Sequence, residues 1–264
     1  MNLLFIGAGK MASALAAGLQ KKNIFPHDNL WACDISAAAR EQFTKSSGLP
    51  CVEDPSALIG KADVLILAVK PQVAQAVVSA LPPRKNDALI ISICAGVSIL
   101  KLRQWFASGR IVRVMPNTPL MVGMGASCYA LGTESDEAAA ALSDKIFSAL
   151  GKTWRVSEDL LDAVTAISGS GPAYMFEFVE ALRAAGEKLG LPQELALDLA
   201  VQTMAGSAEM MRQKIASPEE LRKAVTSPGG TTAAALQVLE QADFRALVEN
   251  LTRAACERSA ELGK

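Results

Sequence analysis

The chain has 264 residues, half of them hydrophobic, and a formal net charge of −1. This length suits one large domain or two modest ones, and the composition is globular rather than disordered. The sequence has no concentrated basic stretch of the kind that nucleic-acid binders carry. No apolar run approaches the roughly 20 residues of a membrane span. We therefore expect a soluble, cytoplasmic protein with neither nucleic acid nor membrane as its partner.

The five cysteines are scattered and never spaced C-x-x-C. This pattern is typical of buried thiols in a reducing cytosol, and it favours neither a disulfide framework nor a zinc site. We expect no metal.

Short apolar runs alternate with helical patterns through the first half. The runs predicted as strands are Leu3–Ile6, Leu30–Cys33, Val64–Val69, Leu89–Cys94, Ile111–Met115 and Ser127–Leu131. Several are apolar throughout, as expected for parallel strands covered on both faces. The helical stretches between them include Met11–Lys22, Ala37–Lys45 and Ser98–Phe106. This alternation predicts a Rossmann-type doubly wound sheet, that is, an α/β fold.

A further helix at Glu134–Leu150 and a short strand at Lys152–Val156 are predicted to end this sheet. The rest of the pattern is helical: Asp159–Ile167, Pro172–Leu189, 192–213, Thr232–Gln241 and Phe244–Leu262. Ser217 and Glu220 have the spacing of a capping box, with Pro218 at the first helical position. We therefore expect two domains, an α/β domain over 1–156 and an all-helical domain over 157–264.

The first predicted strand runs directly into Gly7-Ala8-Gly9-Lys10-Met11-Ala12, which is followed by a helix. In this context the G-x-G-x-x-A pattern predicts dinucleotide binding. The first glycine makes a tight turn, the second lets the backbone approach a pyrophosphate, and the helix dipole faces the phosphates. Gly7, Ala8, Gly9, Lys10 and Met11 are therefore candidate NAD(P)-binding residues.

The second predicted strand is followed by Asp34-Ile35-Ser36. An acidic residue at this place usually accepts the ribose hydroxyls of NAD and repels a 2′-phosphate. Asp34 is equally suited to cap a helix that starts near Ser36. Both interpretations stay open, and so does the choice between NADH and NADPH, since Arg40 is only one helical turn away.

Ligands in this fold bind outside the carboxyl ends of the strands. The candidate cofactor-binding residues there are Ala68, Val69, Lys70, Pro71, Ala95, Gly96 and Asn117. Ala95 and Gly96 are small enough to leave room for a nicotinamide ring. Each segment taken singly is also compatible with an ordinary turn between a strand and a helix.

The sequence offers few acid–base groups. The single histidine, His27, lies in a polar turn before the second strand, where we expect surface. Hydroxyacid dehydrogenases of similar layout place a lysine after a turn like Gly169-Ser170-Gly171, but this chain has none, and Tyr174 is a poor substitute. A C=N bond needs no strong base for hydride delivery, so this inventory favours imine reduction over alcohol oxidation.

The segment Ser227-Pro228-Gly229-Gly230-Thr231-Thr232 precedes an Ala-rich helix. Its glycines expose backbone N–H groups beside a helix N-terminus, and its threonines add hydroxyls. This arrangement suits a carboxylate, at about 1.5–3 kcal/mol for each charge-assisted hydrogen bond. A helix cap preceded by a turn is the alternative interpretation.

At this point the sequence resembles the Δ1-pyrroline-5-carboxylate reductase family over essentially its whole length. The stretches that carry the resemblance are Phe5–Met11, Asp162–Tyr174, Ser227–Thr232, Ala68–Pro71 and Met115–Pro119. The resemblance implies NAD(P)H-dependent reduction of the cyclic imine 1-pyrroline-5-carboxylate to L-proline, the last step of proline biosynthesis. It also implies a homodimer formed through the helical domain, which in some members assembles further into a decamer.

The same resemblance implies the roles of the helical-domain residues. The substrate carboxylate would be bound by Ser227, Gly229, Gly230, Thr231 and Thr232, and the hydroxyl of Thr232 would be a proton donor near the ring nitrogen. One departure concerns the cofactor, because many family members have a non-acidic group where this chain has Asp34. A reductase of another small imine or ketone, and a protein that binds NAD(P) without turnover, are the alternatives to this function.

Overall fold

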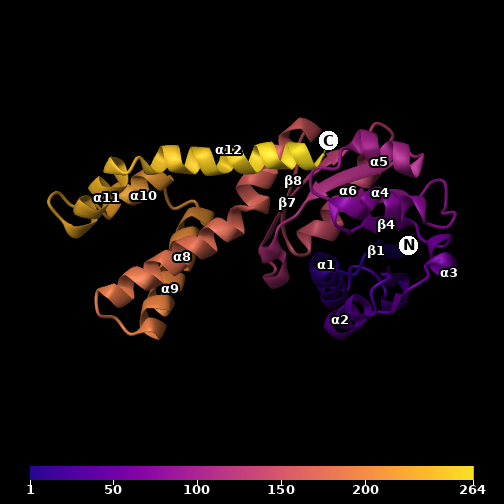
Figure 1. The fold of residues 1–264 in the computed structure, drawn as a ribbon, viewed down its shortest axis with the longest axis horizontal. Coiled ribbons are helices and arrows are strands. Elements are labelled where there is room, and N and C mark those ends of the chain that lie inside the picture. Colours follow the sequence, from indigo (N-terminus) through magenta and orange to yellow (C-terminus); the bar gives the residue numbers. More distant parts are fainter. Residues whose placement is uncertain (264) are drawn as a thin grey trace. The chain divides into compact units, whose positions relative to one another are not determined.

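The computed structural model describes residues 1–263, and its first part is an eight-stranded sheet with helices on both faces (Figure 1). The strands are β1 (Leu3–Ile6), β2 (Leu30–Cys33), β3 (Cys51–Val52), β4 (Val64–Leu67), β5 (Leu89–Ser92), β6 (Ile111–Met115), β7 (Gly125–Leu131) and β8 (Gly151–Arg155). Their order across the sheet is β3-β2-β1-β4-β5-β6-β7-β8. The predicted Rossmann-type sheet is confirmed.

The helices are α1 (Lys10–Lys21), α2 (Ala37–Ser47), α3 (Ser56–Ile59), α4 (Pro71–Ser79), α5 (Ile99–Phe106), α6 (Glu137–Ser148), α7 (Leu161–Val164), α8 (Gly171–Lys188), α9 (Gln193–Arg212), α10 (Pro218–Ala224), α11 (Thr231–Gln241) and α12 (Phe244–Leu262). A π-helix, Thr165–Gly169, connects α7 to α8. None of the helices in the described residues is long and apolar enough to cross a membrane.

All predicted strands are present, and two features of the sheet were not predicted. β3 has only two residues, which is too short for a periodicity signal. β7 pairs with β6 in the antiparallel sense, whereas the other neighbouring strands are parallel. The short loop between β6 and β7 explains this, since a parallel return needs a long crossover.

The apolar runs are continuous because both faces of the sheet are covered. Leu3 and Phe5 point into a core with the side chains of α1, α2 and α6. Leu4 and Ile6 point to the other face, into a core with the side chains of α4 and α5. Alternate side chains of one strand therefore belong to two hydrophobic cores, one on each face of the sheet, and neither face is exposed to solvent.

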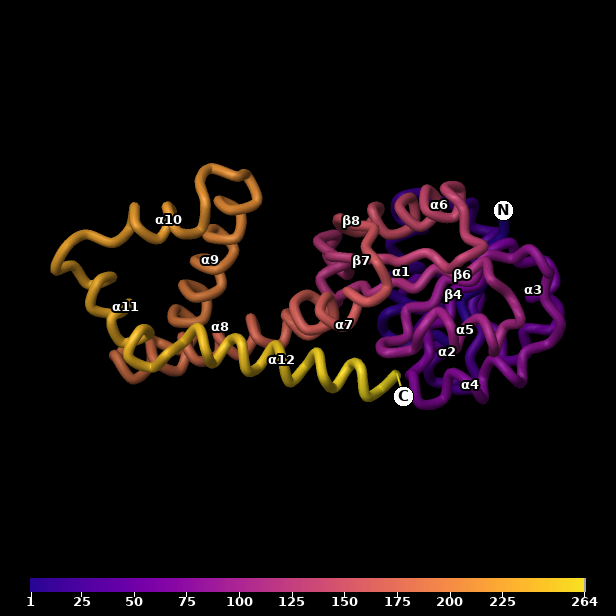
Figure 2. The backbone as a smooth tube through the Cα atoms, turned by 90° about the horizontal axis from the view of Figure 1, so that it is seen from above, coloured from indigo at the N-terminus to yellow at the C-terminus, as the bar shows by residue number. Residues whose placement is uncertain are grey.

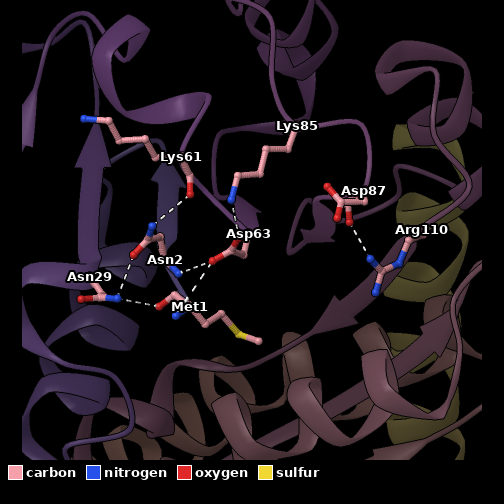
Figure 3. Close-up of polar contacts among 8 residues, drawn as sticks. All are labelled: Met1, Asn2, Asn29, Lys61, Asp63, Lys85, Asp87 and Arg110. Carbon is pink, nitrogen blue, oxygen red and sulfur yellow. Dashed lines mark hydrogen bonds and ion pairs between the residues drawn. The ribbon is translucent and has the colours of Figure 1, made fainter.

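The amino-terminal edge of the sheet is held by a polar network around Asp63, just before β4 (Figure 3). The Asp63 carboxylate accepts a hydrogen bond from the Asn2 backbone N–H at 2.7 Å and forms an ion pair with Lys85 Nζ at 2.5 Å. The hydrogen bond from Lys85 lowers the pKa of Asp63, and the bond from Asn2 adds to this. This network lies at the edge opposite the one where ligands are expected.

By packing, the chain divides into two units. One, the α/β unit, comprises residues 1–170 together with the chain end from 254, and the other, the helical unit, comprises 171–253. The predicted division at 156/157 follows secondary-structure type, since no strand follows β8 up to residue 263. As a division between functional domains it stays a prediction.

Within the helical unit, α8 and α9 lie side by side (Figure 2). The predicted capping box at the start of α10 is confirmed, with both reciprocal bonds between Ser217 and Glu220. Apart from Gly171, only Ala196 and Ala200 are buried among residues 171–253. The single chain therefore gives this unit almost no hydrophobic core of its own.

Candidate functional site

The order of strands reverses between β1 and β4. From β1 the chain builds outward to β2 and β3 on one side, and β4, β5 and β6 extend the sheet on the other. In an open parallel sheet, ligands bind at the carboxyl ends of the strands beside such a reversal. The segments that follow β1, β2, β4, β5 and β6 therefore form the candidate cofactor site.

The loop after β1 has the backbone that the glycine pattern requires. Gly7 adopts φ +101°, and a Cβ there would lie 2.7 Å from the Ala68 carbonyl oxygen. At Gly9, by contrast, a Cβ would meet no atom within 4 Å, so this side of the loop faces open space. Gly9 is also the N-cap residue of α1, and no side chain caps that helix. The N–H groups of Lys10 and Met11 are therefore free of intrahelical partners, as an anion cradle requires.

Asp34 holds the glycine loop, a role that the sequence did not reveal. One carboxylate oxygen accepts the Ala8 N–H at 2.8 Å and the other accepts the Ser36 N–H at 2.8 Å. The cap of α2 is Ser36, whose hydroxyl accepts from the Ala39 N–H. Of the two interpretations left open, capping by Asp34 is therefore wrong, because Asp34 bonds the residue before the helix and the loop after β1, and the contact with a ribose stays a prediction. Each Asp34 oxygen keeps a lone pair for a ribose hydroxyl.

Arg40 lies next to this segment but is already engaged. Its guanidinium donates to the backbone carbonyls of Asp34 and Ile35 and forms an ion pair with Glu53 at 2.9 Å. A 2′-phosphate would have to share this cation with a carboxylate.

The segment after β4 comes directly beside the glycine loop. The Ala68 N–H donates to the Ile6 carbonyl at 2.8 Å, which continues the pairing of β4 with β1. Lys70 is the exposed N-cap residue of α4, with Pro71 at the first helical position. The Cys94 thiol donates to the Val69 carbonyl at 3.2 Å and so joins the ends of β4 and β5. This geometry brings Ala68, Val69, Lys70 and Pro71 to the predicted edge.

Gly96, after β5, has a neighbour that was not predicted. It adopts φ +75°, and a Cβ there would lie 2.7 Å from the Ser259 carbonyl oxygen and 2.9 Å from the Gly263 nitrogen. The space that this glycine leaves is therefore occupied by the end of α12 rather than kept free for a ring. Ala95 is partly exposed next to it. The role of Ala95 and Gly96 toward the cofactor stays a prediction.

The carboxamide of Asn117 is used within the protein. Its Nδ2 donates to the Ser168 carbonyl in the π-helix at 3.1 Å, and its Oδ1 accepts the Ala126 N–H of β7 at 2.8 Å. The residue is buried. If Asn117 contacts the cofactor as predicted, it has to do so while its side chain keeps these two hydrogen bonds.

A buried arginine on β6 belongs to a group that sequence reasoning missed. Arg113 is 6% exposed and forms ion pairs with Glu158 at 3.2 Å and Asp162 at 3.5 Å. Asp162 also accepts a hydrogen bond from the buried Ser259 hydroxyl at 2.7 Å. A charged residue inside an apolar strand is a signal that partners must exist, although it does not say which. We call Arg113, Glu158, Asp162 and Ser259 the charged cluster.

The second predicted site, Ser227–Thr232, lies in the helical unit. Gly229 adopts φ +69°, and the Gly230 N–H donates to the Ser227 carbonyl at 3.1 Å, which closes a tight turn. Gly230 is the N-cap residue of α11, and no side chain caps this helix. Thr231 and Thr232 are its first residues, so their N–H groups have no intrahelical partner. The alternative interpretation, a helix cap preceded by a turn, is therefore confirmed for the backbone, with Gly230 as the cap, and carboxylate binding by this segment stays a prediction.

The remaining acid–base candidates are His27, Tyr174 and the cysteines. The His27 side chain is half exposed, as predicted, and it contacts Asp28 and the Gly48 carbonyl. The Tyr174 hydroxyl is buried and has no hydrogen-bond partner in the described part of the chain. All five cysteines are free, and burial raises the pKa of Cys33 to about 12, so this thiol stays protonated.

Two family profiles match this chain. The profile described as pyrroline-5-carboxylate reductase dimerisation matches residues 158–262, and one described as NADP oxidoreductase, coenzyme F420-dependent, matches residues 2–96. Together they cover the helical segment and the first part of the sheet.

Full-length relatives and solved structures agree with these profiles. Pyrroline-5-carboxylate reductases from Arabidopsis thaliana and Pseudomonas aeruginosa are 40% and 42% identical, over 98% and 100% of this chain and 95% and 97% of theirs. The crystal structure of the Plasmodium falciparum pyrroline carboxylate reductase with NADP bound is 36% identical, with a TM-score of 0.91 over 100% of this chain and 98% of that one. The chain belongs to the pyrroline-5-carboxylate reductase family.

Proposed function

We propose that this protein reduces 1-pyrroline-5-carboxylate to L-proline with NADPH or NADH as the hydride donor. The observation that carries this function is full-length similarity to such reductases in a chain whose glycine loop forms an open cradle at Gly9. The reduction is the last step of proline biosynthesis. Five free thiols suit the cytoplasm, which we propose as its compartment.

The residues at the carboxyl edge fit a dinucleotide. The uncapped start of α1 supplies N–H groups for a pyrophosphate, and the open side of Gly9 leaves room for it. The fixed carboxylate of Asp34 presents its free lone pairs to a ribose. We propose that Gly7–Met11, Asp34 and Ser36 hold the phosphate and ribose groups, and that Ala68–Pro71, Ala95, Gly96 and Asn117 line the rest of the site.

Reduced nicotinamide, when bound, supplies the hydride that adds to the carbon of the C=N bond. This addition leaves the ring nitrogen with an electron pair, so a proton must be present there. The nitrogen of the neutral imine accepts a hydrogen bond from a hydroxyl and takes its proton as the hydride adds to the carbon, and solvent water then returns a proton to the hydroxyl. The protein therefore has to orient the imine and donate one hydrogen bond, and it needs no strong base.

We propose that Ser227–Thr232 provides this orientation. The N–H groups at the start of α11 and the Ser227 hydroxyl bind the carboxylate of the substrate. A Cβ at Gly230 would lie 2.5 Å from Ser227 Oγ, so only glycine lets this hydroxyl fold back over the turn. Thr232, partly buried in the first turn of α11, then donates its hydroxyl to the ring nitrogen.

We also propose that the working form is a homodimer built through the helical unit. The family profile that covers 158–262 is one of dimerisation, so the chain associates with other copies. Large apolar side chains of this unit are exposed in the single chain, Phe176 at 68% and Val238 at 64% among them. A second copy is the occupant that would cover them. Assembly of dimers into a decamer is a further possibility that the same experiment measures.

Purified protein should consume NAD(P)H in the presence of 1-pyrroline-5-carboxylate and form L-proline in equal amount. Light scattering of the same sample gives the number of subunits. Cofactor binding without turnover would favour a sensor, and turnover only with another imine or a ketone would refute the substrate.

The variant Thr232→Ala tests the proton donor. We expect kcat to fall about a hundredfold, as for loss of a positioned acid, while cofactor affinity changes little. Thr226→Ala is the matched control, because the Thr226 hydroxyl donates to the Arg222 carbonyl in the last turn of α10, which ends before Thr226. Equal losses of kcat and cofactor affinity in Thr232→Ala would contradict the role.

A further inference from the structure

The end of α12 contacts the β5–α5 loop through two glycines. A Cβ on Gly96 would lie 2.7 Å from the Ser259 carbonyl oxygen, and a Cβ on Gly263 would lie 2.2 Å from the Gly96 carbonyl oxygen. The two backbones therefore touch where a side chain on either residue would separate them. This contact lies just before α5, which begins three residues after Gly96.

The charged cluster holds the same region through a second set of bonds. The Ser259 hydroxyl donates to Asp162 across 97 positions of sequence, and Asp162 is held in turn by Arg113. Glu158, the other partner of Arg113, accepts the Ile99 N–H at 2.6 Å. Ile99 is the first residue of α5, so the loop that precedes it is held at Gly96 by α12 and at Ile99 by Glu158.

The cluster also lies where the chain enters and leaves the α/β unit. Asp162 belongs to the segment that precedes the exit at 170/171, and Ser259 belongs to the segment that follows the return at 253/254. The hydrogen bond from Ser259 to Asp162 therefore ties the outgoing connection to the returning one. The burial of Arg113 and Ser259, both under 10% exposed, keeps water from competing for these bonds.

We propose that Ser259 and Gly263 are positioning residues for hydride transfer, acting through the charged cluster and Gly96. They hold the β5–α5 loop, which is proposed to line the cofactor site, against the end of α12. This inference rests on the proposed function, because it assigns the cofactor to the loop that these residues hold. Neither residue is required to touch the substrate or the cofactor.

Ser259→Ala removes the bond to Asp162 and leaves the rest of the cluster in place. We expect kcat to fall about tenfold, which corresponds to a loss of roughly 1.4 kcal/mol, while the NADPH dissociation constant, measured by fluorescence, stays within about twofold of the wild type. Ser259→Thr keeps the hydroxyl and should restore most of kcat. Thr252→Ala is the matched control on the same helix, because the Thr252 hydroxyl donates only to carbonyls of its own helix.

Gly263→Ala tests the contact by a different route. Gly263 has no positive φ, so the added methyl group introduces a clash with Gly96 without backbone strain. We expect faster hydrogen–deuterium exchange in 94–99 and 254–262, with the protection of β1 and β4 unchanged. This measurement needs neither cofactor nor substrate.

The outcomes separate this inference from the proposed function. Wild-type protein that fails to reduce the imine would refute the function, whereas the exchange experiment would still test the contact. The positioning role would be overturned by Ser259→Ala with wild-type kcat, by an equal loss in Thr252→Ala, or by NADPH affinity that falls in step with kcat. Unchanged exchange in Gly263→Ala would also overturn it.

Discussion

The two units of this protein obtain their stability in different ways. The α/β unit buries whole strands, and side chains such as Phe5, Phe43 and Phe147 are completely enclosed by its own residues. The helical unit buries little more than Ala196 and Ala200, while its larger apolar side chains stay exposed. One unit carries its own core, and the other leaves apolar side chains exposed, which we propose form half of a dimer interface.

This difference extends to the two candidate sites. The cofactor side is organised by bonds within the chain, such as those of Asp34 to the glycine loop and of Asn117 to the π-helix. The proposed substrate loop, Ser227–Thr232, is mostly exposed in the single chain. We infer that the α/β unit presents a preformed site, whereas the substrate side is completed only when a second copy covers the helical unit.

The largest effect is expected from a charge placed on the exposed apolar surface of the helical unit. Either Phe176→Glu or Val238→Glu should prevent association and lower kcat/KM at least about a hundredfold, a loss of roughly 2.7 kcal/mol. Light scattering and steady-state kinetics measure the two effects together. Val73→Glu is the control, because Val73 is a 47% exposed apolar residue of α4 in the self-contained unit. A fully active monomer would contradict the inference that a second copy completes the substrate side.

The next largest effect is expected at the candidate cofactor site of the α/β unit. Asp34→Ala removes the acceptor of the Ala8 N–H, a charge-assisted bond worth about 1.5–3 kcal/mol. We expect the KM for NADH to rise about tenfold, and NADPH to gain relative to NADH because a negative charge is removed from the ribose side. Asp54→Ala is the control, since the exposed Asp54 bonds only Ser56 nearby. An unchanged ratio of kcat/KM values would mean that Asp34 does not face the ribose.

The fold was predictable from the sequence wherever local pattern decides it. Continuous apolar runs gave the strands, and Pro, Gly and the Ser217 capping box gave the ends of several helices. The antiparallel sense of β7 follows from the short β6–β7 loop, but an apolar run alone does not state its direction. β3 was not predicted, because two residues are too few to show a hydrophobic periodicity.

The candidate site was predictable in its position and less so in its bonds. The glycine pattern located the cradle, because Gly7 and Gly9 have conformational needs that are local. The charged cluster joins residues as far apart as Asp162 and Ser259, and no local pattern specifies such a contact. Arg113 within an apolar strand is a signal of buried partners that was missed, and it does not identify those partners.

A smaller effect, on stability, is expected from Asn117→Asp. The carboxylate can still accept the Ala126 N–H, but it cannot donate to the Ser168 carbonyl. We expect a destabilisation of about 1–3 kcal/mol, because two buried acceptors then face each other, seen as a lower thermal midpoint. Asn86→Asp, at an exposed position of the same unit, is the control. If NADPH affinity falls while the midpoint does not, Asn117 serves the cofactor and not the π-helix.

The smallest effect concerns the amino-terminal edge of the α/β unit, where a core already stabilises the fold. The pKa of Asp63 is lowered, chiefly by its bond with Lys85, so the folded state favours the charged carboxylate. Stability from this source is present above the ordinary aspartate pKa of about 3.9 and is lost as the pH falls through the lower folded value. Since both side chains are over a third exposed, solvent limits the contribution to about 1 kcal/mol or less.

Asp63→Asn should therefore lower the thermal midpoint slightly at pH 7, and the difference in midpoint from the wild type should close below about pH 4. Asp87→Asn is the control, because the Asp87 carbonyl rather than its carboxylate accepts from Arg110. A difference that does not narrow as the pH falls below about 4 would show that Asp63 stabilises this edge through shape and not through charge.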